Sequence, residues 1–124
     1  MRLVTFHHDG TDRLGALSDD AVIDLASGDP GLPTDMVDLI ADWDLDRVSA
    51  AVAAGERIPL TDVTIRAPLR MRKNVFAVGR NYRDHAQEFS DSGFDASTQQ
   101  TIPDNPMIFT KPPTSVIGPD EAIV

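Results

Sequence analysis

The sequence contains no cysteine, which excludes disulfide bonds, thiolate-bound metals and a cysteine nucleophile. Aromatic residues make up only 6% of the 124 residues, but 41% are hydrophobic and 25% charged, as in a folded domain rather than a disordered tail. No apolar run approaches the roughly 20 residues that span a bilayer, and the first residues lack the hydrophobic stretch of a secretory signal. We therefore expect a folded protein of the cytoplasm with a modest core.

Positive charge is scarce in the first half of the chain. Residues 1–62 hold 4 of the 11 basic residues and 13 of the 20 acidic ones, and the whole chain carries a net charge of −9. Such an acidic surface argues against nucleic acid or an anionic membrane as partner. Six basic residues cluster between Arg66 and Arg83. They indicate either a solvated or inter-domain face, or a surface that attracts an anionic substrate such as a dicarboxylate.

The first 25 residues have the pattern of a three-stranded antiparallel meander. The alternation of apolar residues predicts strands over 2–6, 13–18 and 21–25. Asp9-Gly10 is a strong hairpin signal between the first two strands. His7 and His8 lie beside this turn, and neighbours on a strand point to opposite faces. Solvated histidines are therefore the favoured interpretation there, rather than a metal site.

Two helices are predicted next. Thr34 is expected to cap the first, which carries an apolar stripe from Met36 to Ile40. Asp44 is expected to cap the second helix, Leu45–Ala54, which Gly55 ends. Its small alanines allow close packing on the meander. Trp43, between the two helices, is expected to fill the core.

A strand over residues 60–65 and a basic, proline-containing hinge over 66–73 are predicted to follow. The expected organisation is a small N-terminal α+β accessory domain, residues 1–70, and the start of a β-rich domain, residues 71–124. The chain ends on apolar residues without a cap or a polar tail. We therefore expect it to be the first part of a longer protein.

The most informative stretch begins with the apolar run Val75–Val78, a predicted strand that Gly79 ends. Asn81 is expected to cap a short helix on which His85 and Glu88, three residues apart, share one face. A carboxylate beside an imidazole orients the ring and favours its protonated form, which is how a general base is built. From these residues alone, a solvated helix with an accidental His-Glu pair is the alternative.

The segment after this helix is polar and irregular. Residues 89–105 form a long stretch without a secondary-structure pattern, which indicates either a lid or disorder. A short strand over 107–110 then leads into Lys111-Pro112-Pro113, where two prolines exclude helix and central-strand pairing. A strand followed by a turn is expected over 114–119, and another strand is expected to begin over 122–124.

Two segments of the chain resemble the fumarylacetoacetate hydrolase family. They are Val-Gly-Arg-Asn-Tyr-Arg-Asp-His-Ala-x-Glu, residues 78–88, and Pro-Met-Ile-Phe-Thr-Lys-Pro-Pro-Thr-Ser-Val-Ile-Gly-Pro, residues 106–119. The resemblance runs from about residue 73 to residue 124. It implies the incomplete opening of that family's mostly β catalytic domain, preceded by the small accessory domain that many members carry. Thr110 and the length of the loop after Glu88 depart from the family pattern.

The resemblance implies an enzyme acting on β-diketo and related oxo acids. It makes His85 the general base and Glu88 its orienting partner, and it lines the substrate site with Arg80, Tyr82 and Lys111. Carbon–carbon bond hydrolysis by an activated water is the first expectation. Isomerisation or decarboxylation of an oxo-dicarboxylate is the alternative. Which oxo acid is used does not follow from the sequence.

The resemblance also implies a divalent metal, Mg²⁺ or alternatively Mn²⁺ or Ca²⁺, that holds the substrate oxygens. The family's metal ligands, a Glu-x-Glu pair and a later acid, have no match after Lys111. The metal is thus expected only in a full-length parent protein. That parent is expected to be a homodimer that acts in aromatic catabolism. This chain alone is expected to be an inactive accessory module. A phosphate-binding turn at Gly79 is a further alternative, although one glycine does not make a glycine-rich loop.

Overall fold

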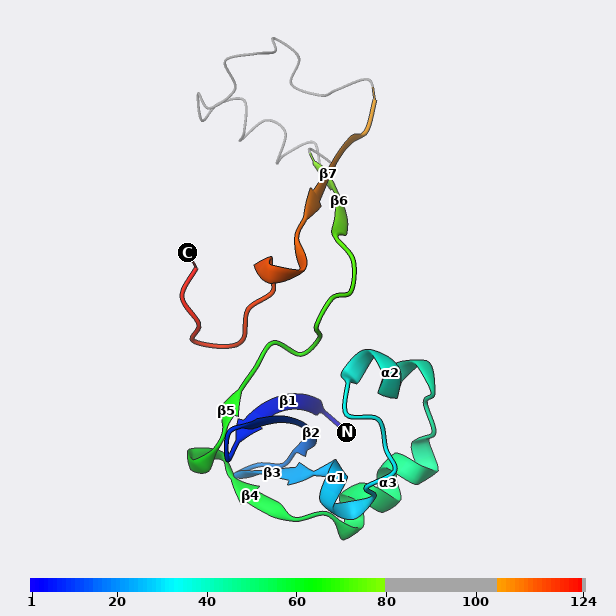
Figure 1. The fold of residues 1–124 in the computed structure, drawn as a ribbon, viewed down its shortest axis with the longest axis vertical. Coiled ribbons are helices and arrows are strands. Elements are labelled where there is room, and N and C mark those ends of the chain that lie inside the picture. Colours follow the sequence, from blue (N-terminus) through cyan, green and yellow to red (C-terminus); the bar gives the residue numbers. More distant parts are fainter. Residues whose placement is uncertain (80–104, 124) are drawn as a thin grey trace. The chain divides into compact units, whose positions relative to one another are not determined.

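The computed structural model describes residues 1–79 and 105–123 (Figure 1). The chain divides into two compact units, Met1–Met71 with Val116–Val124, and Arg72–Ser115. The predicted domain boundaries, 1–70 and 71–124, stay a prediction.

The first unit is built on a five-stranded antiparallel sheet. Its order is β4-β3-β2-β1-β5, and its strands are β1 Leu3–His8, β2 Thr11–Leu17, β3 Ala21–Asp24, β4 Arg57–Pro59 and β5 Thr64–Ile65. The predicted meander is β1-β2-β3 and is confirmed. Asp9 and Gly10 both have positive φ, 47° and 76°, as a two-residue hairpin turn requires. This turn sets the register that pairs His8 with Thr11.

The strand predicted over residues 60–65 is wrong for most of its length. Leu60–Asp62 form a 3₁₀ turn, η1, and only Thr64–Ile65 pair with β1. The sheet order explains the difference, because β4 and β5 lie at opposite edges. The chain must cross from one edge to the other, and η1 lies on that crossing. The edge strand β4, Arg57–Pro59, was not predicted.

Three helices follow capping aspartates. α1 Leu25–Gly28 was predicted as the end of a strand and a loop, and its cap is Asp24. α2 Met36–Ala41 is capped by Asp35, whose carboxylate accepts the N–H groups of Val37 and Asp38. The prediction of Thr34 as this cap is therefore wrong by one residue. α3, capped by Asp44, spans Leu45–Ala54 as predicted.

Small residues set the spacing between α1 and α3. A Cβ on Gly28 would lie 2.1 Å from the carbonyl oxygen of Ala51, so only glycine fits there. Gly55 ends α3 with φ −73°, which is not the left-handed cap that a terminal glycine predicts. Its reason is again proximity, because a Cβ there would lie 2.6 Å from the carbonyl oxygen of Asp24.

The core has two clusters on opposite faces of the sheet. The helices cover one face, where buried side chains come from β2, all three helices and the loop between α1 and α2: Leu14, Leu25, Leu32, Met36, Leu39, Val48 and Ala51. The curl of the sheet encloses the other face around Phe6, Val22 and Ile58. Trp43 belongs to neither cluster and is 45% exposed, so its predicted place in the core is wrong. It lies where α2 turns into α3.

The second unit contains an antiparallel hairpin of β6 Val75–Gly79 and β7 Met107–Lys111, with both strands as predicted (Figure 1). A 3₁₀ turn, η2 Pro113–Ser115, follows. The strands predicted within 114–119 and over 122–124 are wrong for the described residues up to 123, whereas the turn predicted at the end of 114–119 agrees with the turn at residues 119–120. Instead, the carboxylate of Glu121 accepts the N–H of Gly118 at 2.8 Å and closes a turn.

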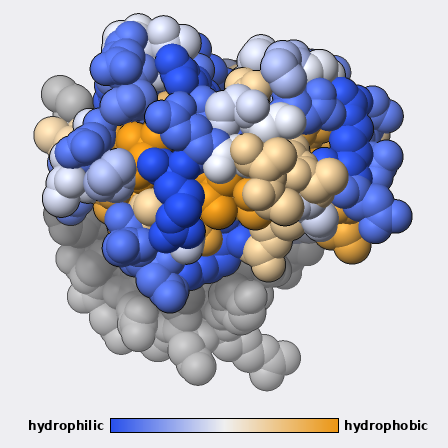
Figure 2. Space-filling model, turned by 90° about the horizontal axis from the view of Figure 1, so that it is seen from below, coloured by the Kyte–Doolittle hydropathy of each residue, from blue (hydrophilic) through white to orange (hydrophobic). Residues whose placement is uncertain are grey.

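Hydrophilic residues dominate the face of the first unit seen in Figure 2, with hydrophobic side chains showing between them. The acidic excess of the first half of the sequence agrees with this surface. In the part of the chain that the structure describes, no helix has the length and apolar character needed to cross a bilayer.

Candidate functional site

Four of the five predicted site residues lie outside the described residues. They are Arg80, Tyr82, His85 and Glu88. The predicted lid or disordered loop over 89–105 lies outside them as well, apart from residue 105. Lys111 is described, at the end of β7. The β6–β7 hairpin is therefore the part of the predicted site that the structure describes.

The register of the hairpin fixes where Lys111 lies. Lys111 pairs with Val75, and Gly79 pairs with Met107. A strand rises about 3.4 Å per residue, so the backbone of Lys111 lies about 14 Å along the hairpin from Gly79, which precedes the first predicted site residue, Arg80. Next to Lys111, Asn74 Nδ2 donates to Thr110 Oγ1 at 3.4 Å. Thr110, the departure from the family pattern, thus ties the open end of the hairpin together.

Lys111 is exposed, and its ammonium lies over an aromatic ring. Nζ is 5.8 Å from the centroid of the Phe109 ring, within the range of a cation–π interaction. Phe109 is itself 45% exposed. An ammonium held over a ring can still pair with a carboxylate or with a developing enolate.

The basic cluster predicted from Arg66 to Arg83 has a structural component. Arg70 donates to the carboxylate of Asp12, and Arg66 lies 3.8 Å from the same carboxylate and 3.2 Å from Glu121. His7 Nδ1 is 2.7 Å from Asp12. These contacts lie within the first unit. They favour the structural interpretation for Arg66 and Arg70.

The electrostatics of this cluster centre on Asp12. Its hydrogen bond to His7 lowers the pKa of the Asp12 carboxyl, the nearby Arg70 guanidinium lowers it further, and partial burial opposes both. Asp12 is therefore an anion that joins the β1–β2 hairpin to the segment around Arg70. His7, predicted to be a solvated turn residue, has this carboxylate as its partner.

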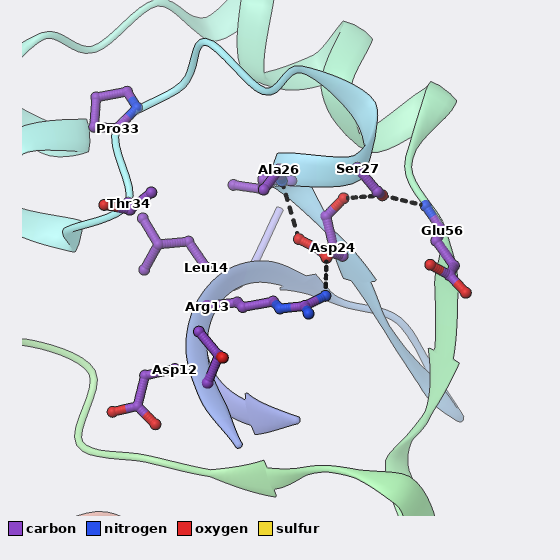
Figure 3. Close-up of a pocket in the computed structure, with 11 residues that line it drawn as sticks. Asp12, Arg13, Leu14, Asp24, Ala26, Ser27, Pro33, Thr34 and Glu56 are labelled. Carbon is purple, nitrogen blue, oxygen red and sulfur yellow. Dashed lines mark hydrogen bonds and ion pairs between the residues drawn. The ribbon is translucent and has the colours of Figure 1, made fainter. Parts of the chain in front are cut away.

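A pocket of about 390 Å³ lies in the first unit, between β2, the start of α1 and the loop before α2 (Figure 3). It is lined by Thr11, Asp12, Arg13, Leu14, Asp24, Leu25, Ala26, Ser27, Pro33, Thr34 and Glu56. Its volume is within the range of small-molecule sites. Its walls combine apolar side chains with an ion pair.

The ion pair in this pocket joins Arg13 to Asp24. Arg13 Nη1 donates to Asp24 Oδ2 at 2.9 Å, and Asp24 Oδ1 accepts the N–H of Ala26 at 3.0 Å (Figure 3). Asp24 is only 1% exposed. Ser27 donates its hydroxyl to the carbonyl oxygen of Asp24 and accepts the N–H of Glu56. The polar groups deepest in the pocket are thus satisfied by one another, and none of the lining residues is a histidine or lysine that would serve as a base.

Sequence reasoning missed this pair. An aspartate that ends an apolar strand two residues before a helical N–H is a cap signal, and it would have located Asp24 and α1. The partner, Arg13, is eleven residues away and follows only from the pairing of β2 with β3.

A metal site is not present among residues 1–79 and 105–123. No group of three or more His, Cys, Asp or Glu side chains gathers there in a way that would hold an ion. The described residues therefore do not fit the predicted metal.

The chain is similar to known proteins in both sequence and fold. The sequence profile of the family described as Fumarylacetoacetate (FAA) hydrolase C-terminal matches residues 74–124. The chain is 34% identical over 111 residues to the mitochondrial oxaloacetate tautomerase Fahd2a of Rattus norvegicus, covering 83% of this chain and 31% of that protein. The chain spans about a third of the length of the curated relatives that it matches, 35% and 31% for the first two.

Two solved structures are similar to the chain. A candidate HpcE protein from Mycobacterium smegmatis has a TM-score of 0.60 and 33% identity, covering 96% of this chain and 39% of that one. A fumarylacetoacetate hydrolase from Exiguobacterium antarcticum has a TM-score of 0.56 and 25% identity, covering 94% of this chain and 37% of that one. The predicted fold class is confirmed, a small α+β chain with a curled antiparallel sheet that matches part of such a protein.

Proposed function

Because the chain belongs to the fumarylacetoacetate hydrolase family, we propose that it is part of an enzyme that moves a proton on a small oxo-dicarboxylate, as in the keto–enol tautomerisation of oxaloacetate. The observation that carries the proposal is the 34% identity over 111 residues to an oxaloacetate tautomerase. This identity favours isomerisation, the alternative in our sequence analysis, over carbon–carbon bond hydrolysis.

The proposed reaction breaks one O–H bond and forms one C–H bond, with no redox change. The enol loses its hydroxyl proton, the carbonyl forms, and the neighbouring carbon gains a proton. In the proposal, His85 transfers the proton, and Glu88 orients the ring and stabilises its protonated form. Lys111 pairs with a substrate carboxylate or with the enolate oxygen. Arg80 and Tyr82 line the site.

The divalent metal belongs to the proposal only for the full-length protein. A bound Mg²⁺ would polarise the substrate carbonyl, but the described residues offer no ligand cluster, and no step above passes through it. The cytoplasmic location and the homodimer also stay proposals. For this chain alone, we propose a non-catalytic accessory role of the first unit, supported by its own two-sided core.

Carbon–carbon bond hydrolysis is the second candidate, favoured by the similarity to a fumarylacetoacetate hydrolase structure. The two reactions are separated by their products. Tautomerisation leaves the mass of the substrate unchanged, whereas hydrolysis adds one water and releases two smaller acids. Mass spectrometry of the same reaction mixture therefore decides between them.

The test is an ultraviolet assay of enol-oxaloacetate decay, run with the 124-residue chain and with the longest reading-frame product that contains it, across a range of Mg²⁺ concentrations. We expect turnover by the longer product, and a decrease of about 10²–10⁴-fold in kcat for His85→Ala, the usual contribution of a general base. His8→Ala is the matched control. His8 lies at the end of β1, and its change should alter the rate by less than about twofold.

Unchanged turnover in His85→Ala would refute the role of His85. Formation of two smaller acids from a β-diketo acid, without tautomerase activity, would refute the isomerase in favour of the hydrolase.

A further inference from the structure

We propose that Phe109 is a positioning residue that holds the ammonium of Lys111 over the face of the β6–β7 hairpin and toward Gly79. The role of Lys111 in the reaction rests on the proposed function. The positioning itself rests on the geometry of three described residues. In the sequence, Phe109 is one of the apolar residues of the predicted strand over 107–110, and the sequence assigns it no role of its own.

The pairing of the hairpin places the backbone of Lys111 away from Gly79. That backbone lies opposite Val75, at the far end from Gly79. Arg80, the first of the predicted site residues, follows Gly79 in the sequence. A lysine that pointed straight out of the sheet would hold its charge about 14 Å along the strand from Gly79.

Phe109 lies between the two ends on the same face. Residues two apart on a strand share a face, and directly paired residues of an antiparallel hairpin do too. Gly79, Phe109 and Lys111 therefore share one face, and Phe76 and Ile108 share the other. Phe109 pairs with Ala77, midway along the hairpin.

The Phe109 ring lies near both Lys111 and Gly79 on its face. On one side, the Lys111 ammonium lies 5.8 Å from its centroid. On the other, its Cε1 and Cδ1 atoms would lie 3.5 Å and 3.7 Å from a Cβ placed on Gly79. The ring thus extends diagonally from Gly79 to the ammonium, and Lys111 leans back along the strand over it.

Gly79 leaves room for this ring. A methyl group there would make ordinary van der Waals contact at 3.5 Å, so Gly79→Ala should leave the ring in place. A valine side chain would extend beyond that contact into the ring. Gly79→Val should therefore displace Phe109 and release Lys111 without altering either residue.

The first experiment measures position independently of activity. The chain has only two lysines, Lys73 and Lys111, so lysine labelled with ¹³C at the ε-carbon gives two signals, and Lys73 is the internal reference. A side chain held over an aromatic face has its ε-proton resonances shifted upfield by the ring current. We expect this upfield shift for Lys111, its loss in Phe109→Leu and Gly79→Val, and its return in Phe109→Tyr.

Phe76→Leu is the matched control for that series. It removes a phenyl ring from the opposite face of the same hairpin, where Phe76 is 74% exposed. The Lys111 shift should remain in this variant. A shift that was absent in the wild-type chain, or that disappeared equally in Phe76→Leu, would overturn the proposal.

The second experiment uses the longer protein that shows turnover. Phe109→Leu should lower kcat/KM by roughly two- to fivefold if the cation–π contact is exposed and by about thirtyfold if it is desolvated. In a Lys111→Gln background, the same change should have no further effect. An equal loss in both backgrounds would show a merely structural role and would refute positioning.

The two experiments distinguish a failure of the proposed function from a failure of the positioning role of Phe109. If no oxo-acid turnover is found in any form, the proposed function fails, and the shift of the Lys111 signal still decides whether Phe109 holds the ammonium. If turnover is found but the shift is absent, Phe109 has no positioning role, and the tautomerase proposal stands on His85.

Discussion

Replacing Asp24 with alanine is expected to lower the free energy of unfolding by about 3–4 kcal/mol. Asp24 is 1% exposed and makes two hydrogen bonds with its carboxylate, one from Arg13 at 2.9 Å and one from the Ala26 N–H at 3.0 Å. Losing a hydrogen bond between charged groups costs about 1.5–3 kcal/mol, and losing a helix cap costs about 1 kcal/mol. The Arg13 side chain is 34% exposed and can regain water, which keeps the total below the upper end of about 5 kcal/mol for buried pairs.

The measurement is urea unfolding followed by the fluorescence of Trp43, the single tryptophan of the chain. With an m-value of about 1 kcal/mol/M, the midpoint should fall by about 3 M. Asp20→Ala is the matched control, because Asp20 also pairs with an arginine at 2.9 Å, but its side chain is 85% exposed. Exposed pairs contribute at most about 1 kcal/mol, so the control should change the midpoint by less than about 1 M.

A loss for Asp24→Ala no larger than that of Asp20→Ala would refute the reasoning, because burial would then have no effect on the strength of the pair. Arg13→Met separates the ion pair from the cap. If the two variants are coupled through the ion pair, the double variant should be less destabilised than the sum of the single ones by at least about 1 kcal/mol.

Two further predictions concern Asp12 and the hairpin. The folded-state pKa of Asp12 is lowered from 3.8, so its stabilising effect is complete above that pH and is lost as the pH falls through the folded value. Asp12→Asn should therefore be less stable than wild type in urea at pH 7, with the difference closing below pH 3.8; a difference independent of pH would contradict this. Phe76 and Ile108 are 74% and 67% exposed on one face of the hairpin, so Phe76→Ser with Ile108→Thr should reduce the binding of a hydrophobic dye. Unchanged dye fluorescence would show that this face is covered.

The elements that the sequence predicts correctly are those with local signals. Asp9-Gly10 specifies its turn through two positive φ angles, and Asp44 specifies the start of α3 through its own carboxylate. The elements that were missed depend on distant partners. β4 exists because Arg57–Pro59 reach β3, and the place of Trp43 depends on how α2 turns into α3. No window of sequence contains those contacts.

The same distinction between local signals and distant contacts applies to the candidate site. The strands on both sides of the predicted motif follow from their apolar, β-favouring residues, and both are present. The position of the Phe109 ring near Gly79 and Lys111 does not follow from composition. It depends on the register that pairs Val75 with Lys111, since a slip of one residue would move the ring to the other face.

The basic cluster shows why a count of charges does not identify a substrate site. Its first members, Arg66 and Arg70, neutralise Asp12 and, through Arg66, also Glu121. A guanidinium that is already paired with a carboxylate has little potential left to attract a dicarboxylate. The attraction of an anionic substrate, if the proposed function holds, must therefore come from cations beyond this pair, and Lys111 is the described residue whose ammonium lies over a ring instead of beside an acid. For this reason the hairpin, rather than the arginine-rich hinge, is the place to search for substrate contacts.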